Sequence, residues 1–221
     1  MSLKIFDLDE TLIAADSVTL FGRFLLSEGV VDERFVEQES LYMDQYSAGK
    51  LDIHDFVDFF VGALRHLPVS DIQKMMPRFV ESYIKPVVYH QGQARVKHYK
   101  EQGHDLLIIS ATPAFVVKEI AALLGIENVL AIDLVEEEVA GQSMYSGEIL
   151  GTPTFREGKV TRLRSWLASN GASLKDSTFY SDSSNDIPLL ELVDHPVVIN
   201  PDERLLLKAQ QDNWSVLHWK N

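Results

Sequence analysis

Residues 3–11 of the 221-residue chain read LKIFDLDET. The first half of this stretch is apolar enough for a short buried strand, and polar side chains follow at once with Asp7, Asp9 and Thr11. In a parallel α/β sheet, ligands bind beyond the carboxyl ends of the strands. The stretch therefore predicts an acidic ligand site where a first strand ends, provided that the rest of the chain forms such a sheet.

The rest of the chain predicts this sheet, interrupted by one block of helices. From residue 91 onward, apolar runs alternate with helical patterns, and the run at 106–109 has the continuous apolar character of a buried parallel strand. Residues 16–85 instead carry their apolar side chains at helical spacing. We predict a doubly wound, Rossmann-like α/β core formed by 1–15 and 86–221, with 16–85 inserted as a helical cap domain of the C1 type.

Two local patterns refine the prediction for the core. Thr112 is expected to be the N-cap of a helix over 113–124, with Pro113 in its first turn. A second helix is expected over 187–193, and glycines at turn positions indicate a β excursion over 133–157.

Composition narrows the classes of partner. Twenty Lys and Arg against 33 Asp and Glu give a formal net charge of −13, with 46% hydrophobic residues and no cysteine. The negative charge argues against nucleic acid or an anionic membrane as the main partner. The absence of cysteine excludes disulfides, thiol catalysis and cysteine metal sites. No apolar run approaches the ~20 residues that span a bilayer. Because acidic residues near the start leave no room for a signal-peptide core, we expect a cytoplasmic protein.

Polar residues also follow the later predicted strands. Ser110 comes directly after the run at 106–109, and Asp182 and Asp186 come after a strand over 178–180. Lys159 opens the helix before that strand. Since the carboxyl ends of parallel strands meet at one edge of a sheet, we expect these residues to gather near Asp7 and Asp9.

A phosphate ester would need such a set. Clustered carboxylates repel one another unless a cation lies among them, and oxygen ligands with open positions suit Mg²⁺. One carboxylate can attack phosphorus, and a second, two residues on, can protonate the leaving oxygen. Ser110 and free N–H groups at a helix start can bind phosphoryl oxygens, while Lys159 stabilises the negative charge of the transferring group.

Each residue taken alone also fits a plainer role. The first two aspartates could belong to a solvated loop, Ser110 could simply lead into a helix, and Lys159 could be a solvated residue at a helix start. Asp182 and Asp186 could be acids at a helix N-terminus. The order and strand-end placement of all the residues together favour the site.

The set resembles the four motifs of the haloacid dehalogenase-like (HAD) phosphohydrolases. Residues 7–11 match the first motif, Ser110 the second, Lys159 the third, and Asp182 with Asp186 the fourth. The match runs along the whole chain. A helical cap between the first two motifs resembles subfamily IB, the group that contains phosphoserine phosphatase.

The resemblance implies a role for each residue. Asp7 would be the nucleophile of an aspartyl-phosphate mechanism, and Asp9 the general acid and then the general base. Mg²⁺ would be bound by Asp7, by the backbone carbonyl of Asp9 and by Asp182, with Asp186 orienting a metal-bound water or Lys159. The residues implied to bind phosphate are Thr11, Ser110, Ala111 and Lys159. An aspartate at position 9 favours phosphoryl transfer over dehalogenation.

The substrate implied is a small, amine-bearing phosphomonoester. In phosphoserine phosphatases an acid nine residues after the nucleophile contacts the substrate amine, and Asp16 has that spacing here, although Glu is usual. Asp16 could equally be the N-cap of a helix that starts near Ser17.

Two departures from the phosphoserine phosphatase pattern bear on the substrate. The serine of the second motif is followed by Ala111 and Thr112 in place of Gly-Gly. The arginine that grips the substrate carboxylate has no clear match; the basic residues available by composition are Arg23, Arg34, Lys50 and Arg65. A missing carboxylate clamp favours a phosphoamine without a carboxylate, such as histidinol phosphate, on which some similar IB phosphatases act.

Three other functions remain open from the sequence. A phosphomutase uses the same motifs but returns the phosphoryl group to its substrate. A receiver-type signalling domain also combines acids, a hydroxyl residue and a lysine around Mg²⁺, but it is shorter and carries its phosphorylated Asp on a later strand. A catalytically silent binding protein on the same fold is disfavoured by the complete acidic set.

Overall fold

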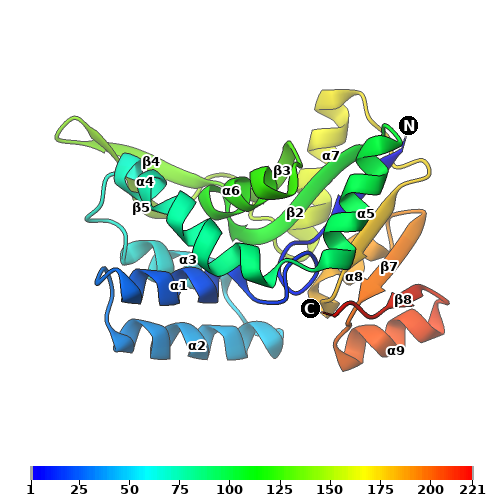
Figure 1. Cartoon of the computed structure of the whole chain (residues 1–221), viewed down its shortest axis with the longest axis horizontal. Coiled ribbons are helices and arrows are strands. Elements are labelled where there is room, and N and C mark those ends of the chain that lie inside the picture. The colour runs from blue at the N-terminus through cyan, green and yellow to red at the C-terminus, as the bar shows by residue number, and fades with distance from the viewer. Residues whose placement is uncertain (1, 221) are drawn as a thin grey trace.

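The computed structural model describes residues 2–220 and is built around a six-stranded parallel sheet (Figure 1). Its strand order is β3-β2-β1-β6-β7-β8. In that order the strands are Asn128–Ile132, Asp105–Pro113, Leu3–Phe6, Thr178–Ser181, His195–Ile199 and Ser215–Leu217. The sheet confirms the predicted α/β, Rossmann-like fold class. From β1 the chain first adds β2 and then β3 on one side. It then crosses to the other side of β1 and adds β6, β7 and β8, so the strand order reverses at β1.

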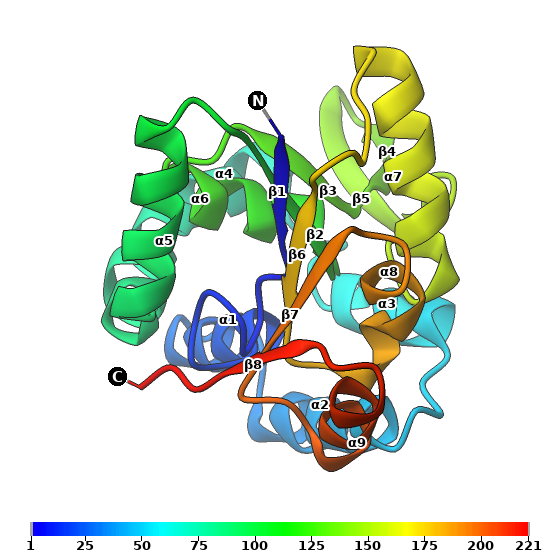
Figure 2. The ribbon, with the colours of Figure 1, turned by 90° about the vertical axis from the view of Figure 1, so that its right-hand side faces the viewer.

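Helices cover both faces of this sheet (Figure 2). Those on one face are α5 (His90–Glu101) and α6 (Ala114–Leu124); those on the other are α7 (Glu157–Asn170), α8 (Ile187–Leu190) and α9 (Glu203–Gln211). Side chains alternate along each strand, so Ile5 packs into the apolar cluster beneath α7, α8 and α9, whereas its neighbour Phe6 packs into the other. The sheet is therefore buried on both sides, as a parallel sheet requires.

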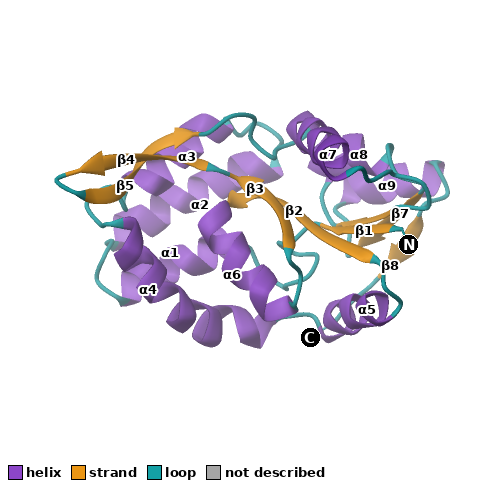
Figure 3. Cartoon of the chain, turned by 90° about the horizontal axis from the view of Figure 1, so that it is seen from above, coloured by secondary structure: helices purple, strands orange, loops and turns teal. Residues whose placement is uncertain are grey.

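Between β1 and β2 the chain forms a helical segment, residues 16–87 counted from the N-cap Asp16, at one end of the molecule (Figure 3). Its elements are α1 (Ser17–Ser27), α2 (Glu33–Ser47), α3 (Ile53–Gly62), α4 (Val69–Phe79), a π-helical turn (Val80–Ile84) and a 3-10 turn (Lys85–Val87). Aromatic rings fill its centre: the Phe21 ring lies 5.0 Å from that of Phe79 and 5.7 Å from that of Phe115 in α6. Phe6 of the sheet belongs to the same apolar cluster, so the helical segment and the sheet share one core.

An antiparallel hairpin, β4 (Leu134–Val139) with β5 (Gln142–Ile149), occupies the predicted β excursion. Ala140 and Gly141 have φ of 52° and 81°, the positive values that a two-residue hairpin turn of type I′ requires. Arg65, which follows α3, donates from Nε to the Ser146 carbonyl over 2.7 Å. This contact ties the hairpin to the helical segment.

Two local predictions were wrong in detail. Thr112 is not a helix N-cap, because β2 continues to Pro113 and α6 begins at Ala114 without a side-chain cap. The helix expected over 187–193 ends at Leu190.

The sequence reading also missed the last two elements of the chain, α9 and β8. Asp202 caps α9 by accepting a hydrogen bond from the Leu205 N–H over 2.7 Å. No helix in residues 2–220 is long and apolar enough to cross a membrane.

Candidate active site

Asp7 lies at the point where the strand order reverses. It follows β1 directly, and its N–H donates to the Tyr180 carbonyl of β6 over 2.8 Å. The residue is only 5% exposed. Asp182 follows the end of β6, so two carboxylates from distant parts of the sequence meet at the carboxyl edge of the sheet, where open α/β sheets bind ligands.

Lys159 is the buried cation of this edge rather than a solvated residue at a helix start. It is 2% exposed, and its Nζ lies 2.8 Å from a carboxylate oxygen of Asp7 and 2.8 Å from one of Asp186. Asp186 also accepts from the Ser181 hydroxyl over 2.8 Å, so its side chain holds the lysine and caps no helix. Although burial opposes the charge of Lys159, the two carboxylates outweigh it and raise the pKa of the ammonium group.

The contact with Lys159 also affects the pKa of Asp7. Burial raises the pKa of the Asp7 carboxyl to about 7, against the opposing effect of Lys159, and the charges of Asp186 and Asp9 add to the rise. A carboxylate at this position is thus held in its ionised form chiefly by its lysine partner.

The turn before α7 determines where Lys159 lies. Arg156 has φ 50°, a conformation rare for a side chain of this size. A Cβ on Gly158 would lie 2.0 Å from the Pro153 carbonyl oxygen, so only glycine fits there. The residue before the lysine is therefore fixed by backbone packing.

Asp9 is held by three donors. Its Oδ1 accepts from the Ser17 N–H over 2.7 Å, and its Oδ2 accepts from the Thr112 hydroxyl over 2.9 Å and, at the limit of hydrogen bonding, from the Ser110 hydroxyl over 3.5 Å. Burial raises the pKa of Asp9 to about 7, and the nearby charge of Asp16 adds to the rise. Near neutral pH the group can therefore both give and accept a proton.

Thr11 is buried completely and donates to Asp182 Oδ1 over 2.9 Å. Its hydroxyl is thus directed at Asp182, and Thr11 does not line the pocket described below. Burial raises the pKa of Asp182 well above its usual value, and the charge of Asp7 raises it further. The two carboxylates destabilise each other when both are ionised.

A divalent cation would relieve this repulsion, and the donors fit one. Within residues 2–220, no three His, Cys, Asp or Glu side chains form a metal cluster by themselves. The expected set needs only the side chains of Asp7 and Asp182 with the Asp9 carbonyl. Mg²⁺ commonly takes one or two carboxylates and completes its shell with water and phosphate oxygens.

Asp16 has one of the two roles that the sequence left open, that of a helix N-cap, and its contact with a substrate amine stays a prediction. It is the N-cap of α1, because its Oδ1 accepts from the Thr19 N–H over 2.8 Å, and it also lines the pocket. Burial raises its pKa to about 6. A carboxyl with this pKa is ionised at neutral pH and offers a negative charge to the pocket.

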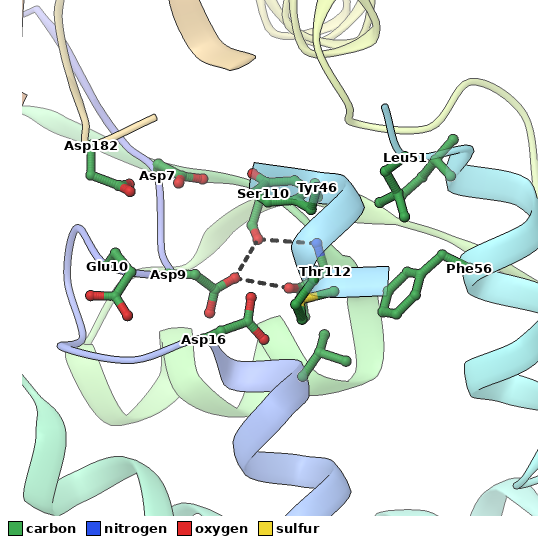
Figure 4. A pocket seen from close by; sticks show the side chains of 14 residues that line it. Asp7, Asp9, Glu10, Asp16, Tyr46, Leu51, Phe56, Ser110, Thr112 and Asp182 are labelled. Carbon is green, nitrogen blue, oxygen red and sulfur yellow. Dashed lines mark hydrogen bonds between the residues drawn. The ribbon is translucent and has the colours of Figure 1, made fainter. Parts of the chain in front are cut away.

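The pocket joins these residues to the helical segment (Figure 4). It encloses about 550 Å³ of empty space, counted to its open mouth. Its acidic end, Asp7, Asp9, Glu10 and Asp182, comes from the sheet side, together with Ser110, Ala111 and Thr112. The helical segment contributes Asp16 and Tyr46 and an apolar wall of Val18, Met43, Leu51, Ile53 and Phe56. None of the described lining residues is Lys or Arg, so Arg23, Arg34, Lys50 and Arg65 all lie outside this lining.

Two site residues escaped the sequence reading. The sequence predicts Thr112 as a helix cap, yet its hydroxyl donates to Asp9, and its N–H donates to the Ser110 hydroxyl over 3.1 Å. Its place two residues after Ser110 is the signal that could have indicated a side chain on the same face of an extended strand. Tyr46 had no such signal, because an aromatic residue on an amphipathic helix usually faces a core.

Known proteins are similar to this chain over most of its length. The model of the family described as haloacid dehalogenase-like hydrolase matches residues 5–191. The chain is 37% identical over 224 residues to a histidinol-phosphatase of Neisseria meningitidis serogroup C, covering 99% of each protein.

Solved structures are similar as well. A protein of unknown function from Bordetella pertussis Tohama I is similar with a TM-score of 0.87 and 34% identity, over 98% of this chain and 97% of that one. A substrate-bound phosphoserine phosphatase has a TM-score of 0.70 at 19% identity, over 99% and 93% of the two chains, which shows a shared fold.

Proposed function

The chain belongs to the haloacid dehalogenase-like hydrolase family and is a phosphatase, and from that premise we propose that it hydrolyses a small amine-bearing phosphomonoester of the histidinol phosphate type with Mg²⁺. The observation that carries the substrate proposal is the lining of the pocket. Asp16 offers a carboxylate to an ammonium group, and the apolar wall can pack against a ring. None of the described lining residues is a Lys or Arg that could bind a substrate carboxylate.

In the first step Asp7 attacks phosphorus. A bond forms between a carboxylate oxygen of Asp7 and phosphorus while the bond from phosphorus to the ester oxygen breaks. Asp9 gives its proton to the leaving oxygen, so the alcohol departs neutral. Lys159 keeps Asp7 ionised and in place, and the Ser110 hydroxyl is available to a phosphoryl oxygen.

In the second step the aspartyl-phosphate is hydrolysed. Asp9, now ionised, removes a proton from water, whose oxygen bonds to phosphorus as the bond to Asp7 breaks, releasing phosphate. Thr112 and the Ser17 N–H hold the Asp9 carboxyl for both transfers. Mg²⁺, bound by Asp7, Asp182 and the Asp9 carbonyl, would neutralise charge on the phosphoryl group. The helical segment excludes water from the pocket during transfer, a role expected of a lid.

The name of the Neisseria relative supports histidinol phosphate as the substrate type. Histidinol phosphate carries an ammonium group and an imidazole ring but no carboxylate, which matches one acid and an apolar wall. Phosphoserine carries both an ammonium and a carboxylate, and the carboxylate would meet Asp16 with no Lys or Arg among the described lining residues to offset the repulsion.

The test is release of inorganic phosphate with Mg²⁺ from histidinol phosphate, phosphoserine, phosphoethanolamine, phosphocholine, sugar phosphates and nucleotides. We expect histidinol phosphate to give the highest kcat/KM, and Asp7→Asn to abolish release. Retention of the phosphoryl group on substrate would identify a phosphomutase instead. Stoichiometric phosphorylation without turnover would identify a signalling domain.

A further inference from the structure

Tyr46 comes from the helical segment, yet it lies among residues of the sheet edge. It is in the last turn of α2, and it lines the same pocket as Asp7, Ser110 and Asp182. Figure 4 shows its side chain directed into the pocket, toward the end that holds Asp7. Nothing in the reaction described above uses this hydroxyl.

The helical segment offers the pocket few polar groups. Of its lining residues, Asp16 and Tyr46 are polar and the rest are apolar. A carboxylate repels a phosphoryl group, whereas a phenol is protonated at neutral pH and donates a hydrogen bond. Tyr46 is therefore the side-chain donor that this segment brings to the pocket among its described lining residues.

A bound phosphoryl group needs such a donor. Its non-bridging oxygens gather charge during transfer, and the protein must meet them with donors or cations. On the sheet side, the lysine ammonium already contacts two carboxylates, which leaves the Ser110 hydroxyl and backbone N–H groups. A hydrogen-bond donor on the opposite side of the pocket would reach the phosphoryl oxygens that the sheet side does not contact.

Contacts with the core hold Tyr46 in this place. Its ring lies 5.9 Å from that of Phe155, which precedes α7. The Arg156 guanidinium lies 4.6 Å from the Phe155 ring, and it donates to the Gly49 carbonyl just beyond α2 over 2.5 Å and to the Asn185 side chain over 3.2 Å. The end of α2 is thus fastened to the segment that leads into Lys159.

From this arrangement we propose that Tyr46 is a substrate-binding residue whose phenolic hydroxyl donates a hydrogen bond to a phosphoryl oxygen. The helical segment delivers this donor only while α2 rests against Phe155 and Arg156. Phosphate binding and closure of the pocket are then linked through one side chain. The proposal rests on the phosphatase reaction alone and not on the amine of the substrate.

The test is Tyr46→Phe, which removes the hydroxyl and keeps the ring. Inorganic phosphate binding is measured by calorimetry with and without saturating Mg²⁺, and turnover with p-nitrophenyl phosphate, which carries no amine. We expect the Kd of phosphate to rise tenfold or more, as for a lost hydrogen bond to a charged group, and kcat/KM to fall by a similar factor. The melting temperature should stay near that of the wild type.

Tyr42→Phe is the matched control. Tyr42 lies one turn earlier on α2, outside the pocket lining, with its ring against Phe56 and Phe59. This variant should bind phosphate as the wild type does. A phosphate Kd within twofold of the wild type in Tyr46→Phe would overturn the proposal. This outcome does not depend on which phosphomonoester is the physiological substrate.

Discussion

At the scale of single residues, the site places like charges close together and offsets them with few partners. Asp9 illustrates the consequence, because two neighbours change its pKa in opposite directions. The charge of Asp16 raises it, and the hydrogen bond from Thr112 lowers it. The protonated form that serves as general acid is therefore adjustable by substitution at either neighbour.

The pH dependence should report this balance. Because the first step needs protonated Asp9, kcat/KM falls as pH rises through about 7. Asp16→Asn removes a like charge, lowers the pKa of Asp9 and should move the fall to lower pH. Thr112→Val removes a donor, raises that pKa and should move the fall to higher pH. Glycerol phosphate, which has no amine, is the substrate for these profiles, and its own ionisation is common to all three enzymes. Shifts in the same direction would contradict the assignment.

We expect the ionised Asp182 carboxylate to destabilise the folded protein in the absence of metal and to stabilise it when a metal ion is bound. Its folded pKa is raised above 3.8, so the folded state binds the proton more tightly and stability is lost as pH rises from about 4 toward the folded pKa. At pH 8 without metal, Asp182→Asn should therefore melt at a higher temperature than the wild type. With Mg²⁺ at about 100 times its Kd the wild type should gain about 2.7 kcal/mol and the variant much less. Thermal melts of the wild type and of Asp182→Asn, in EDTA and in Mg²⁺, measure these two effects. An equal metal-induced shift in the two proteins would show that Asp182 does not bind the metal.

At the scale of elements, the start of α7 determines the position of the buried Lys159. Gly158 packs its α-carbon against the Pro153 carbonyl, so any side chain there displaces either that carbonyl or the helix start. Lys159 Nζ lies 2.8 Å from a carboxylate oxygen of Asp7 and 2.8 Å from one of Asp186, so a shift of the helix start would lengthen at least one of these contacts.

Gly158→Ala should therefore lower both stability and turnover. We expect a loss of about 1–3 kcal/mol, typical of overpacking, and a fall in kcat of more than about tenfold because the lysine moves. The control is Gly62→Ala at the end of α3, where the nearest atom to a new Cβ is Arg65 Nη1 at 3.8 Å. That variant should be neutral or slightly stabilising. Urea unfolding and steady-state kinetics measure the pair, and wild-type kcat in Gly158→Ala would contradict this account of the helix start.

Helices and strands were predictable from the sequence where a local pattern is compatible with only one low-energy conformation. The run at 106–109 fits a buried parallel strand, and the glycines within 133–157 fit the turns of a β excursion. Thr112 was not predictable in this way, because a hydroxyl before a proline satisfies a helix cap as well as it satisfies a carboxylate. Only the tertiary structure, which brings Asp9 within 2.9 Å, decides between the two. The role of Tyr46 was likewise not predictable, because only the tertiary structure shows that its side chain lines the pocket.

At the scale of the whole molecule, the helical segment and the sheet are not independent. The domain boundaries of 1–15 with 86–221 and of 16–85 remain a proposal, and the shared apolar cluster gives it a thermodynamic consequence. Phe21 of α1 packs on Phe115 of α6. Phe21 and Phe6 belong to the same buried apolar cluster, and the partly buried Phe115 packs against it. Loss of packing in the helical segment should therefore unfold the sheet as well.

Phe21→Ala tests this coupling. Deleting a fully buried ring should cost about 3–5 kcal/mol. The three tryptophans, Trp166, Trp214 and Trp219, all lie outside residues 16–85, so their fluorescence reports the sheet region, while far-UV circular dichroism reports all helices. Both unfolding curves should shift together to lower denaturant. A fluorescence midpoint that stays at the wild-type value would show that the helical segment unfolds alone.

The lining of the pocket is also a property of the whole molecule, because its described residues come from four stretches of the chain, within 7–18, 43–56 and 110–112 and at 182. The sequence could indicate the acidic end through its motifs. It could not show that Arg23, Arg34, Lys50 and Arg65 all lie outside the lining, since their positions depend on how four helices pack. That arrangement is the basis of the substrate proposal.

The most direct test of the central claim is the ratio of kcat/KM for histidinol phosphate to that for phosphoserine, measured with Mg²⁺ in the wild type and in Asp16→Asn. The account predicts a ratio well above one in the wild type, by about tenfold or more for a charge-assisted contact, and a marked fall of the ratio in the variant through loss of activity on histidinol phosphate. A wild-type preference for phosphoserine, or a ratio unchanged by Asp16→Asn, would contradict it.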